Sequence, residues 1–147
     1  MVLKNIPLSF VLILLFVSAC DSTKKTENNY VQYVNPLIGT DFTGNTYPGA
    51  QVPFGMVQLS PDNGLPGWDR IAGYFYPDST IAGFSHTHLS GTGAGDLYDV
   101  SFMPVTLPYR EAPQPLGIYS SFSHDDESVS AGYYQVLLKD YGIHVEL

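Results

Sequence analysis

The residues best suited to chemistry lie between positions 80 and 96, in the sequence TIAGFSHTHLSGTGAGD. This segment combines two histidines with several hydroxyl side chains, closely spaced glycines and an aspartate. Buried imidazole and hydroxyl groups cost free energy unless each finds a hydrogen-bond partner, so packing alone rarely selects this mixture. We therefore predict that the segment belongs to a functional site.

Four residues of this region could bind a metal ion or hold a neighbouring domain: His86, His88, Asp96 and Asp99. If a strand continues through both histidines, their rings point to the same side of it. With the two aspartates they would offer nitrogen and oxygen ligands, but a structural zinc site more usually includes thiolates, so no metal site is predicted. We expect instead that all four lie at a domain interface, where they bond to a neighbouring domain or orient its side chains from behind. The remaining possibility is that the histidines are core residues with satisfied hydrogen bonds.

The elements that must position these residues are short strands. The chain has 14 glycines and 11 prolines, and no window after Tyr30 keeps the apolar spacing of a helix long enough for a stable one. We predict strands at residues 56–59, 73–76 and 100–103, each next to a turn signal. Short strands at such spacing predict an all-β fold, an antiparallel β-sandwich.

The last part of the chain predicts a hairpin between residues 133–138 and 143–147. In its second arm, apolar residues alternate strictly with His144 and Glu146, as in a strand with one buried face. Leu147 falls on the apolar phase, without the polar tail that usually closes a domain. A sheet that stopped there would keep an unpaired edge and an uncovered face, so we expect the domain to be incomplete at its C-terminus. The alternative is a small complete sandwich in which this strand docks fully.

The first residues predict export and lipid anchoring. Lys4 precedes an apolar run that ends in VSAC, with Cys20 the only cysteine of the chain. The run is too short to span a bilayer stably, and its ending resembles the lipobox of bacterial lipoproteins. We predict a lipoprotein signal peptide at 1–19, an acylated Cys20 inserted in the bacterial membrane, and a flexible tether at 20–32, which places the protein at the bacterial cell envelope. The alternative is a soluble secreted protein whose cysteine lies near the cleavage site by chance.

Charge excludes one class of partner. The formal net charge is −8, and a surface that acidic repels phosphate backbones, so no nucleic-acid partner is predicted. Acidic residues beside many tyrosines, asparagines and serines suit sugars or cations better. The acidic run HDDE at 124–127 is expected to be a solvated loop, with a peripheral cation site as the alternative. A single cysteine also rules out an internal disulfide framework.

Five motifs carry a resemblance to a known family. They are YVNPLIGT at 33–40, NTYPGA at 45–50, VPFGMVQLSPD at 52–62, IAGFSHTHLSGTG at 81–93 and GYYQV at 132–136. In this order they resemble the N-terminal domain of glycoside hydrolase family 92. The resemblance covers nearly everything from Tyr33 to Leu147, and it implies that residues 33–147 are this domain, incomplete at the C-terminus.

The resemblance implies a secreted bacterial exo-α-mannosidase that trims mannose-containing glycans, either N-glycans or mannans. It implies an N-terminal β-sandwich packed on a larger (α/α)₆ barrel, calcium dependence and inversion of the anomeric centre. The catalytic carboxylates and the calcium ligands are expected mostly from the barrel, which this chain lacks. No catalytic residue is therefore assigned here, and the isolated chain is expected to be inactive. The alternative is a free-standing, membrane-tethered carbohydrate-binding or structural β-sandwich lipoprotein.

The same resemblance implies an aromatic side chain close to the sugar, and Trp68 is the only tryptophan. An indole can stack on the C–H face of a sugar ring, while the adjacent Asp69 could accept a hydrogen bond from a sugar hydroxyl. We therefore predict that Trp68 and Asp69 form one wall of the substrate pocket. The alternative is that the indole fills a gap between two sheets.

Overall fold

The computed structural model describes residues 29–65, 67–91, 93, 99–109, 111–112 and 117–147. The predicted signal peptide, the lipidation site Cys20 and the candidate Asp96 lie outside the described residues. The end of the predicted tether is described, and there Tyr30–Tyr33 form the 3₁₀ helix η1. In the part of the chain covered by these ranges, no helix has the length and apolar character needed to cross a membrane.

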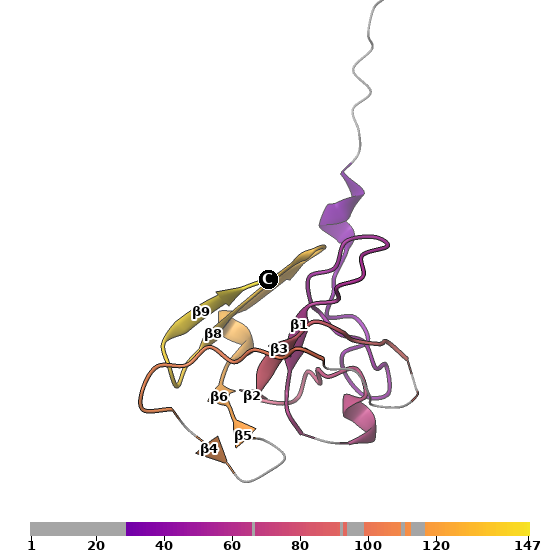
Figure 1. Ribbon diagram of the computed structural model, residues 1–147. Coiled ribbons are helices and arrows are strands. Elements are labelled where there is room, and N and C mark those ends of the chain that lie inside the picture. Colours follow the sequence, from indigo (N-terminus) through magenta and orange to yellow (C-terminus); the bar gives the residue numbers. More distant parts are fainter. Residues whose placement is uncertain (1–28, 66, 92, 94–98, 110, 113–116) are drawn as a thin grey trace, which may run out of the picture.

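The described chain is an antiparallel β structure joined by short 3₁₀ helices (Figure 1). Its strands are β1 Ser60–Asp62, β2 Thr80–Ile81, β3 Gly83–Ser85, β4 Glu111–Ala112, β5 Gly117–Ile118, β6 Ser120–Ser121, β7 Glu127–Ser130, β8 Tyr133–Leu138 and β9 Ile143–Glu146. Its 3₁₀ helices are η1, η2 Trp68–Arg70 and η3 His124–Asp126. The pairs β1–β3, β2–β6 and β4–β5 and the sheet β7–β8–β9 are all antiparallel. The predicted all-β antiparallel fold is confirmed.

The sheet β7–β8–β9 contains the hairpin that the sequence predicts. Its register pairs Val136 of β8 with Val145 of β9 and with Glu127 of β7. β7 and β8 are joined through Gly132, whose φ of +75° is a backbone conformation that favours glycine. Burial alternates along β8, as expected for a strand with one face on the core.

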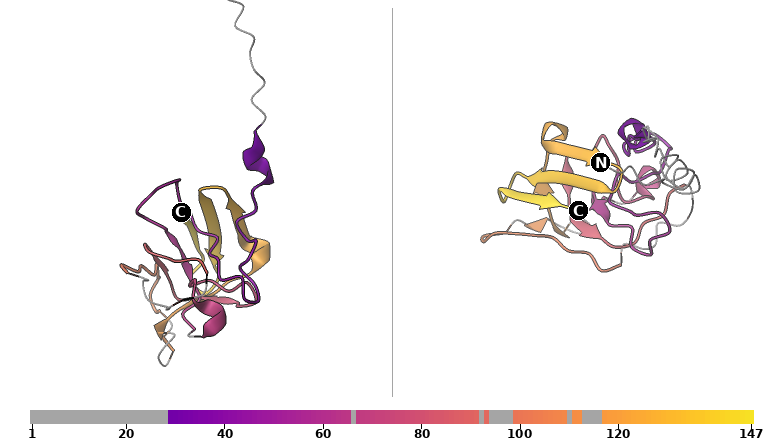
Figure 2. Two further views of the ribbon diagram at one scale, coloured as in Figure 1. Left: turned by 90° about the vertical axis from the view of Figure 1, so that its right-hand side faces the viewer. Right: turned by 90° about the horizontal axis from the view of Figure 1, so that it is seen from above.

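The core lies between this sheet and the short strands β2 and β3 (Figures 1 and 2). From β8, Tyr134, Val136 and Leu138 are fully buried, and they belong to one cluster with Ile81 of β2 and Phe84 of β3. Burying one such aliphatic or aromatic side chain contributes about 1.5–3 kcal/mol, so this cluster is the main source of stability. Two layers of strands around one apolar centre agree with the predicted sandwich.

None of the three strands predicted at residues 56–59, 73–76 and 100–103 forms as a regular strand. Residues 56–59 form no regular strand, because pairing begins with the bridge at Leu59 and becomes regular only from Ser60. Residues 73–76 also form none, since the N–H of Phe75 donates to the Asn63 side chain and that of Tyr76 donates to the Thr40 carbonyl. These distant partners satisfy the backbone in place of a neighbouring strand. Within 100–103, only Phe102 forms a bridge, with Phe84.

Candidate functional site

His88 is one of the buried residues of the segment that sequence analysis selected. Its side chain is 0% exposed, and its Nδ1 donates to the Gln58 carbonyl oxygen at 2.6 Å. Its Nε2 lies 2.8 Å from Oδ1 of Asp62 and 3.2 Å from Oγ of Ser85. The imidazole therefore ties the chain that follows β3 to both ends of β1, and it has the satisfied hydrogen bonds of a core histidine.

The group of Ser85, His88 and Asp62 cannot act as a nucleophilic triad. In such a triad the serine and the carboxylate bond to opposite nitrogens of the imidazole, so that one nitrogen takes the proton while the other is held. Here both groups approach the same atom, Nε2. Ser85 is also completely buried, so no substrate can reach its hydroxyl.

The side chain of His86 points toward residues 99–102, whereas that of His88 points toward β1. Its Nδ1 donates to the carbonyl oxygen of Val100 at 2.6 Å, and its ring meets that of Phe102 edge-on at 5.5 Å. Asp99 lies on the same side, where its N–H donates to Oγ1 of Thr87 at 3.1 Å. The expectation that the two imidazoles share a side is wrong, because β3 ends at Ser85 and the strand alternation does not continue.

The structure thus separates the four candidates. His86 is partly exposed and Asp99 is exposed, His88 is buried, and Asp96 lies outside the described residues. Within the described ranges, no three His, Cys, Asp or Glu side chains come together in a way that could hold a metal ion. His88 cannot touch another domain directly, so any role at an interface would pass through the segment that it holds.

Trp68 lies on η2 and is 64% exposed. The alternative that the indole fills a gap between sheets is therefore wrong. Asp69 follows it on the same short helix and is partly exposed. The structure places both side chains where a ligand could reach them from outside.

Arg70, the last residue of η2, fastens this helix to the rest of the domain. Its Nε donates to Oδ2 of Asp78 at 2.6 Å, and its Nη2 donates to Oδ1 of the same carboxylate. Its guanidinium carbon lies 4.8 Å from the ring centroid of Phe75. The hydrogen bond to Asp78 raises the pKa of Arg70 above its ordinary value. Paired, forked contacts of this kind add geometric precision as well as energy.

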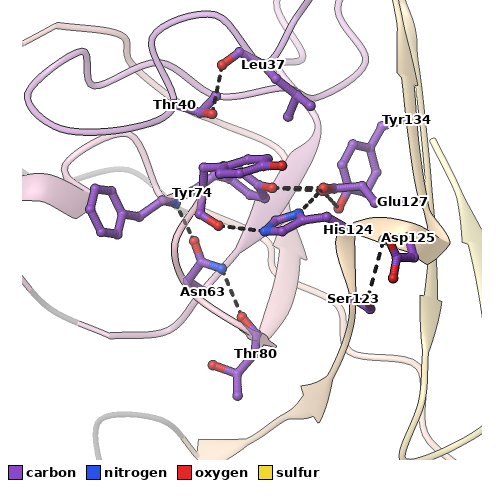
Figure 3. Close-up of polar contacts among 12 residues, drawn as sticks. Leu37, Thr40, Asn63, Tyr74, Thr80, Ser123, His124, Asp125, Glu127 and Tyr134 are labelled. Carbon is purple, nitrogen blue, oxygen red and sulfur yellow. Dashed lines mark hydrogen bonds and ion pairs between the residues drawn. The ribbon is translucent and has the colours of Figure 1, made fainter.

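The turn at residues 75–78, which receives Arg70, is itself well anchored (Figure 3). Buried Asn63 accepts a hydrogen bond from the N–H of Phe75 and donates to the Thr80 carbonyl oxygen at 2.9 Å. The N–H of Tyr76 donates to the Thr40 carbonyl oxygen at 2.8 Å. Contacts from three separate parts of the chain therefore fix this turn.

A buried carboxylate that sequence analysis missed lies next to this turn (Figure 3). The Glu127 side chain is only 2% exposed, and it accepts hydrogen bonds from the hydroxyl groups of Tyr134 at 2.7 Å and Tyr74 at 2.9 Å. Nδ1 of His124 lies 2.6 Å from its other oxygen. Burial, and then the negative charge of Glu127, raises the pKa of both tyrosines far above the ordinary value.

The predicted solvated loop at 124–127 is therefore wrong for two of its residues. His124 donates through Nε2 to the Tyr76 carbonyl oxygen at 2.7 Å, and its ring stacks on that of Tyr76 at 3.9 Å. Only Asp125 and Asp126 are exposed. The spacing of His124 and Glu127, three residues apart after a serine cap, was the available signal, but the tyrosine partners could not be read from it.

Large apolar side chains are exposed near the histidine segment. Phe102 is 60% exposed, and Leu89 of the segment itself is also exposed. Further exposed side chains come from the chain before and after the segment: Phe54, Met56, Val57 and Val100. Monomeric soluble proteins rarely expose many large apolar side chains together, and such groups mark contact surfaces.

These features define the class of the protein: an antiparallel all-β domain with a fixed, hydrogen-bonded histidine segment and an exposed indole. Residues 33–147 match the family model described as the glycosyl hydrolase family 92 N-terminal domain. The chain belongs to glycoside hydrolase family 92, as the resemblance of its motifs predicted.

Solved structures of the family agree. The chain is 47% identical to the family GH92 alpha-mannosidase BT3965 of Bacteroides thetaiotaomicron, solved in complex with mannoimidazole, with a TM-score of 0.75 over 81% of this chain and 16% of that one. It is 31% identical to the family GH92 inverting mannosidase BT2199 of the same organism, with a TM-score of 0.60 over 80% of this chain and 16% of that one. A curated relative, an uncharacterized secreted glycosidase of Arthroderma benhamiae, is 39% identical over 67 residues, which are 46% of this chain and 8% of the relative. The chain thus spans less than a fifth of the length of each of these relatives.

Proposed function

We propose that this chain forms one wall of the mannose pocket of an exo-α-mannosidase that acts on N-glycans or mannans. The observation that carries the proposal is the likeness to the mannosidase BT3965, which is 47% identical over 81% of this chain. Because the chain corresponds to only 16% of that protein, the activity belongs to a larger protein of which this chain would be the N-terminal part.

In this proposal Trp68 and Asp69 are the residues that meet the sugar. The exposed indole would stack on the C–H face of a mannose ring, and the carboxylate would accept a hydrogen bond from a hydroxyl group. The exposure of Trp68 on η2 supports this role. The pair binds and orients sugar but supplies neither an acid nor a base to the reaction.

The interface with the catalytic domain would lie around the histidine segment. His86 and Asp99 reach the surface there beside the exposed Phe102, so polar and apolar groups are both available for a partner domain. Asp96 is retained as a candidate at the same interface, although it lies outside the described residues. His88 would support this surface from behind, by holding the segment on β1.

The chemical step would use groups outside this chain. In an inverting glycosidase, one carboxylic acid protonates the leaving oxygen while a carboxylate activates a water on the opposite face of the sugar. The family relation also favours calcium, which prefers oxygen ligands and when bound would hold sugar hydroxyl groups. Since the described residues offer no cluster suited to a metal, we propose that the calcium ligands and both carboxylates come from a catalytic (α/α)₆ barrel.

We also propose that the protein is anchored at the bacterial cell envelope through acylated Cys20 and a tether that ends near η1. The VSAC sequence at the end of the apolar run supports this proposal. Replacing Cys20 by Ala should abolish incorporation of labelled fatty acid and release the protein from the membrane fraction. Unchanged membrane association of Cys20→Ala would contradict it.

Two measurements test the proposed function. Sequencing the gene beyond the codon of Leu147 should reveal an in-frame catalytic barrel, whereas a stop codon after one further strand would favour the free-standing lipoprotein. Calorimetry with mannose should give no binding to the purified chain at millimolar concentrations, because one wall alone leaves most of the sugar in water. Millimolar or tighter binding would contradict the view that the pocket needs a second domain.

A further inference from the structure

The exposed indole of Trp68 is carried by a very short element. η2 spans only Trp68–Arg70, and its backbone is held by the bonds from Arg70 N–H to the Gly67 carbonyl oxygen at 3.1 Å and from Gly73 N–H to the Arg70 carbonyl oxygen at 3.0 Å. One turn of 3₁₀ helix is marginal by itself, because its hydrogen-bond geometry is poor and few residues share the entropy cost of forming it. The orientation of the indole therefore depends on what fastens η2 to the domain.

Buried Ile71 and Ala72 anchor the chain that follows η2, and the forked contact between Arg70 and Asp78 is the side-chain contact that fastens η2 itself. Both oxygens of the Asp78 carboxylate accept hydrogen bonds from the guanidinium group, whose central carbon also lies over the ring of Phe75. The side chains are 21% and 9% exposed, so solvent weakens this contact less than it weakens a fully exposed ion pair. A planar fork engaged at two points resists rotation, which a single contact does not.

The receiving turn is rigid for independent reasons. Asn63 of the β1–η2 connection holds Phe75, the Thr40 carbonyl oxygen holds Tyr76, and His124 of η3 donates to the Tyr76 carbonyl oxygen. A continuous path of contacts thus leads from the buried layers of the domain to η2. The last link in this path is the Arg70 guanidinium group.

We propose that Arg70 and Asp78 are positioning residues that hold η2 so that the indole of Trp68 faces the sugar in one fixed orientation. This inference rests on the proposed function of Trp68 as a wall of the mannose pocket. A wall that is ordered before the sugar arrives loses less entropy on binding, and it keeps the scissile bond in place relative to the catalytic groups. Neither residue touches the sugar.

The competing explanation is that the pair only adds general stability. The ion pair between Lys139 and Asp126 provides the matched comparison, because it joins two side chains that are 42% and 40% exposed by one contact of 3.1 Å and connects η3 to the turn that follows β8. If the Arg70 pair acts only on global stability, removing either pair should leave the local motion of Trp68 unchanged in the folded protein.

Because Trp68 is the only tryptophan, its fluorescence reports on η2 alone. We would measure time-resolved fluorescence anisotropy of the full chain without sugar, for the wild type and for Arg70→Met, Arg70→Lys and Asp78→Asn, with Lys139→Met as the control. We expect the amplitude of fast indole motion to rise about twofold in Arg70→Met and Asp78→Asn, roughly the difference between rigid and flexible segments. Arg70→Lys should fall in between, since an ammonium group keeps the charge but loses the fork.

Circular dichroism would establish that each variant is folded. If Arg70→Met does not fold, Asp78→Asn still tests the proposal, because asparagine keeps the volume of the aspartate side chain. An unchanged amplitude in folded Asp78→Asn, or an equal rise in Lys139→Met, would overturn the positioning role. The readout is independent of the proposed function, because it needs no sugar. If the indole is loosened by these substitutions but Trp68→Ala leaves mannoside cleavage by the complete gene product unchanged, the proposed function fails and the positioning of η2 stands.

Discussion

The buried carboxylate of Glu127 links three other side chains by hydrogen bonds. Its carboxylate receives hydrogen bonds from Tyr74, from Tyr134 of β8 and from His124 of η3. His124 and Tyr134 are near neighbours of Glu127 in the sequence, whereas Tyr74 is 53 positions away. The carboxylate has almost no contact with water. The hydrogen bonds offset the cost of taking this charge out of water, and removing the carboxylate leaves every donor without its partner.

Replacing Glu127 by Ala should therefore lower the free energy of unfolding by roughly 3–5 kcal/mol, measured by urea denaturation. Asp125→Ala is the matched control, because Asp125 is an exposed acidic residue of the adjacent η3. Its effect should stay within about 0.5 kcal/mol, as for most surface substitutions. Similar effects of the two substitutions would contradict the network described for Glu127.

The tyrosines around Glu127 predict a dependence of stability on alkaline pH. The pKa values of Tyr74 and Tyr134 are raised in the folded protein, by burial and then by the charge of Glu127. Their contribution is fully present below about pH 10, the ordinary pKa of a phenol, and is lost as the pH rises above it, because only the unfolded chain ionises there. Urea denaturation between about pH 8 and pH 11 should show this fall. The Tyr74→Phe, Tyr134→Phe double variant should show a smaller fall, and an unchanged slope would disprove the assignment.

At the scale of elements, the segment after β3 is fixed from two sides. His88 and the bond from Gln58 N–H to the His86 carbonyl oxygen hold it toward β1. His86 and Thr87 hold it toward Asp99 and Val100. This double attachment explains how a segment without regular strand structure can present a fixed surface.

His88→Ala should therefore both destabilise the domain and loosen this segment. We expect a loss of roughly 2–5 kcal/mol in the free energy of unfolding, because the change leaves a cavity and an unpaired Asp62. Amide hydrogen exchange at Gln58 should accelerate, since its N–H bonds to this segment. His144→Ala is the control, because His144 is exposed on β9. If both variants exchange at the same rate at Gln58, the bridging role of His88 is refuted.

The individual elements show how much of the fold could be predicted from the sequence. The hairpin of β8 and β9 was predictable because its strands pair with their nearest neighbours and alternate in polarity. Residues 73–76 were wrongly predicted as a strand, since their backbone partners Asn63 and Thr40 lie far away in the sequence. Glu127 was missed for the same reason, because Tyr74 is 53 positions away from it. The opposite directions of the two imidazoles and the support of η2 by Arg70 could not be predicted, because they depend on tertiary contacts.

For the whole molecule, the family relation and the exposed apolar surface both indicate a domain that works together with a partner domain. The chain has a buried core of its own, yet it exposes large apolar side chains and corresponds to 16% of the mannosidase BT3965. We infer that the domain works by shaping a pocket with a partner domain. We therefore predict that mannose is released only when this domain and its partner domain are both present.

The most direct test of this account compares the complete gene product with its Trp68→Ala variant in the cleavage of an α-mannoside. We predict that the complete protein releases mannose and that the variant loses about tenfold in kcat/KM, which corresponds to about 1.4 kcal/mol of transition-state binding. Tyr30→Ala, which removes another exposed aromatic side chain outside the family match, should leave kcat/KM unchanged. Release of mannose by residues 21–147 alone, or equal kcat/KM for the Trp68→Ala variant and the wild type, would contradict the account.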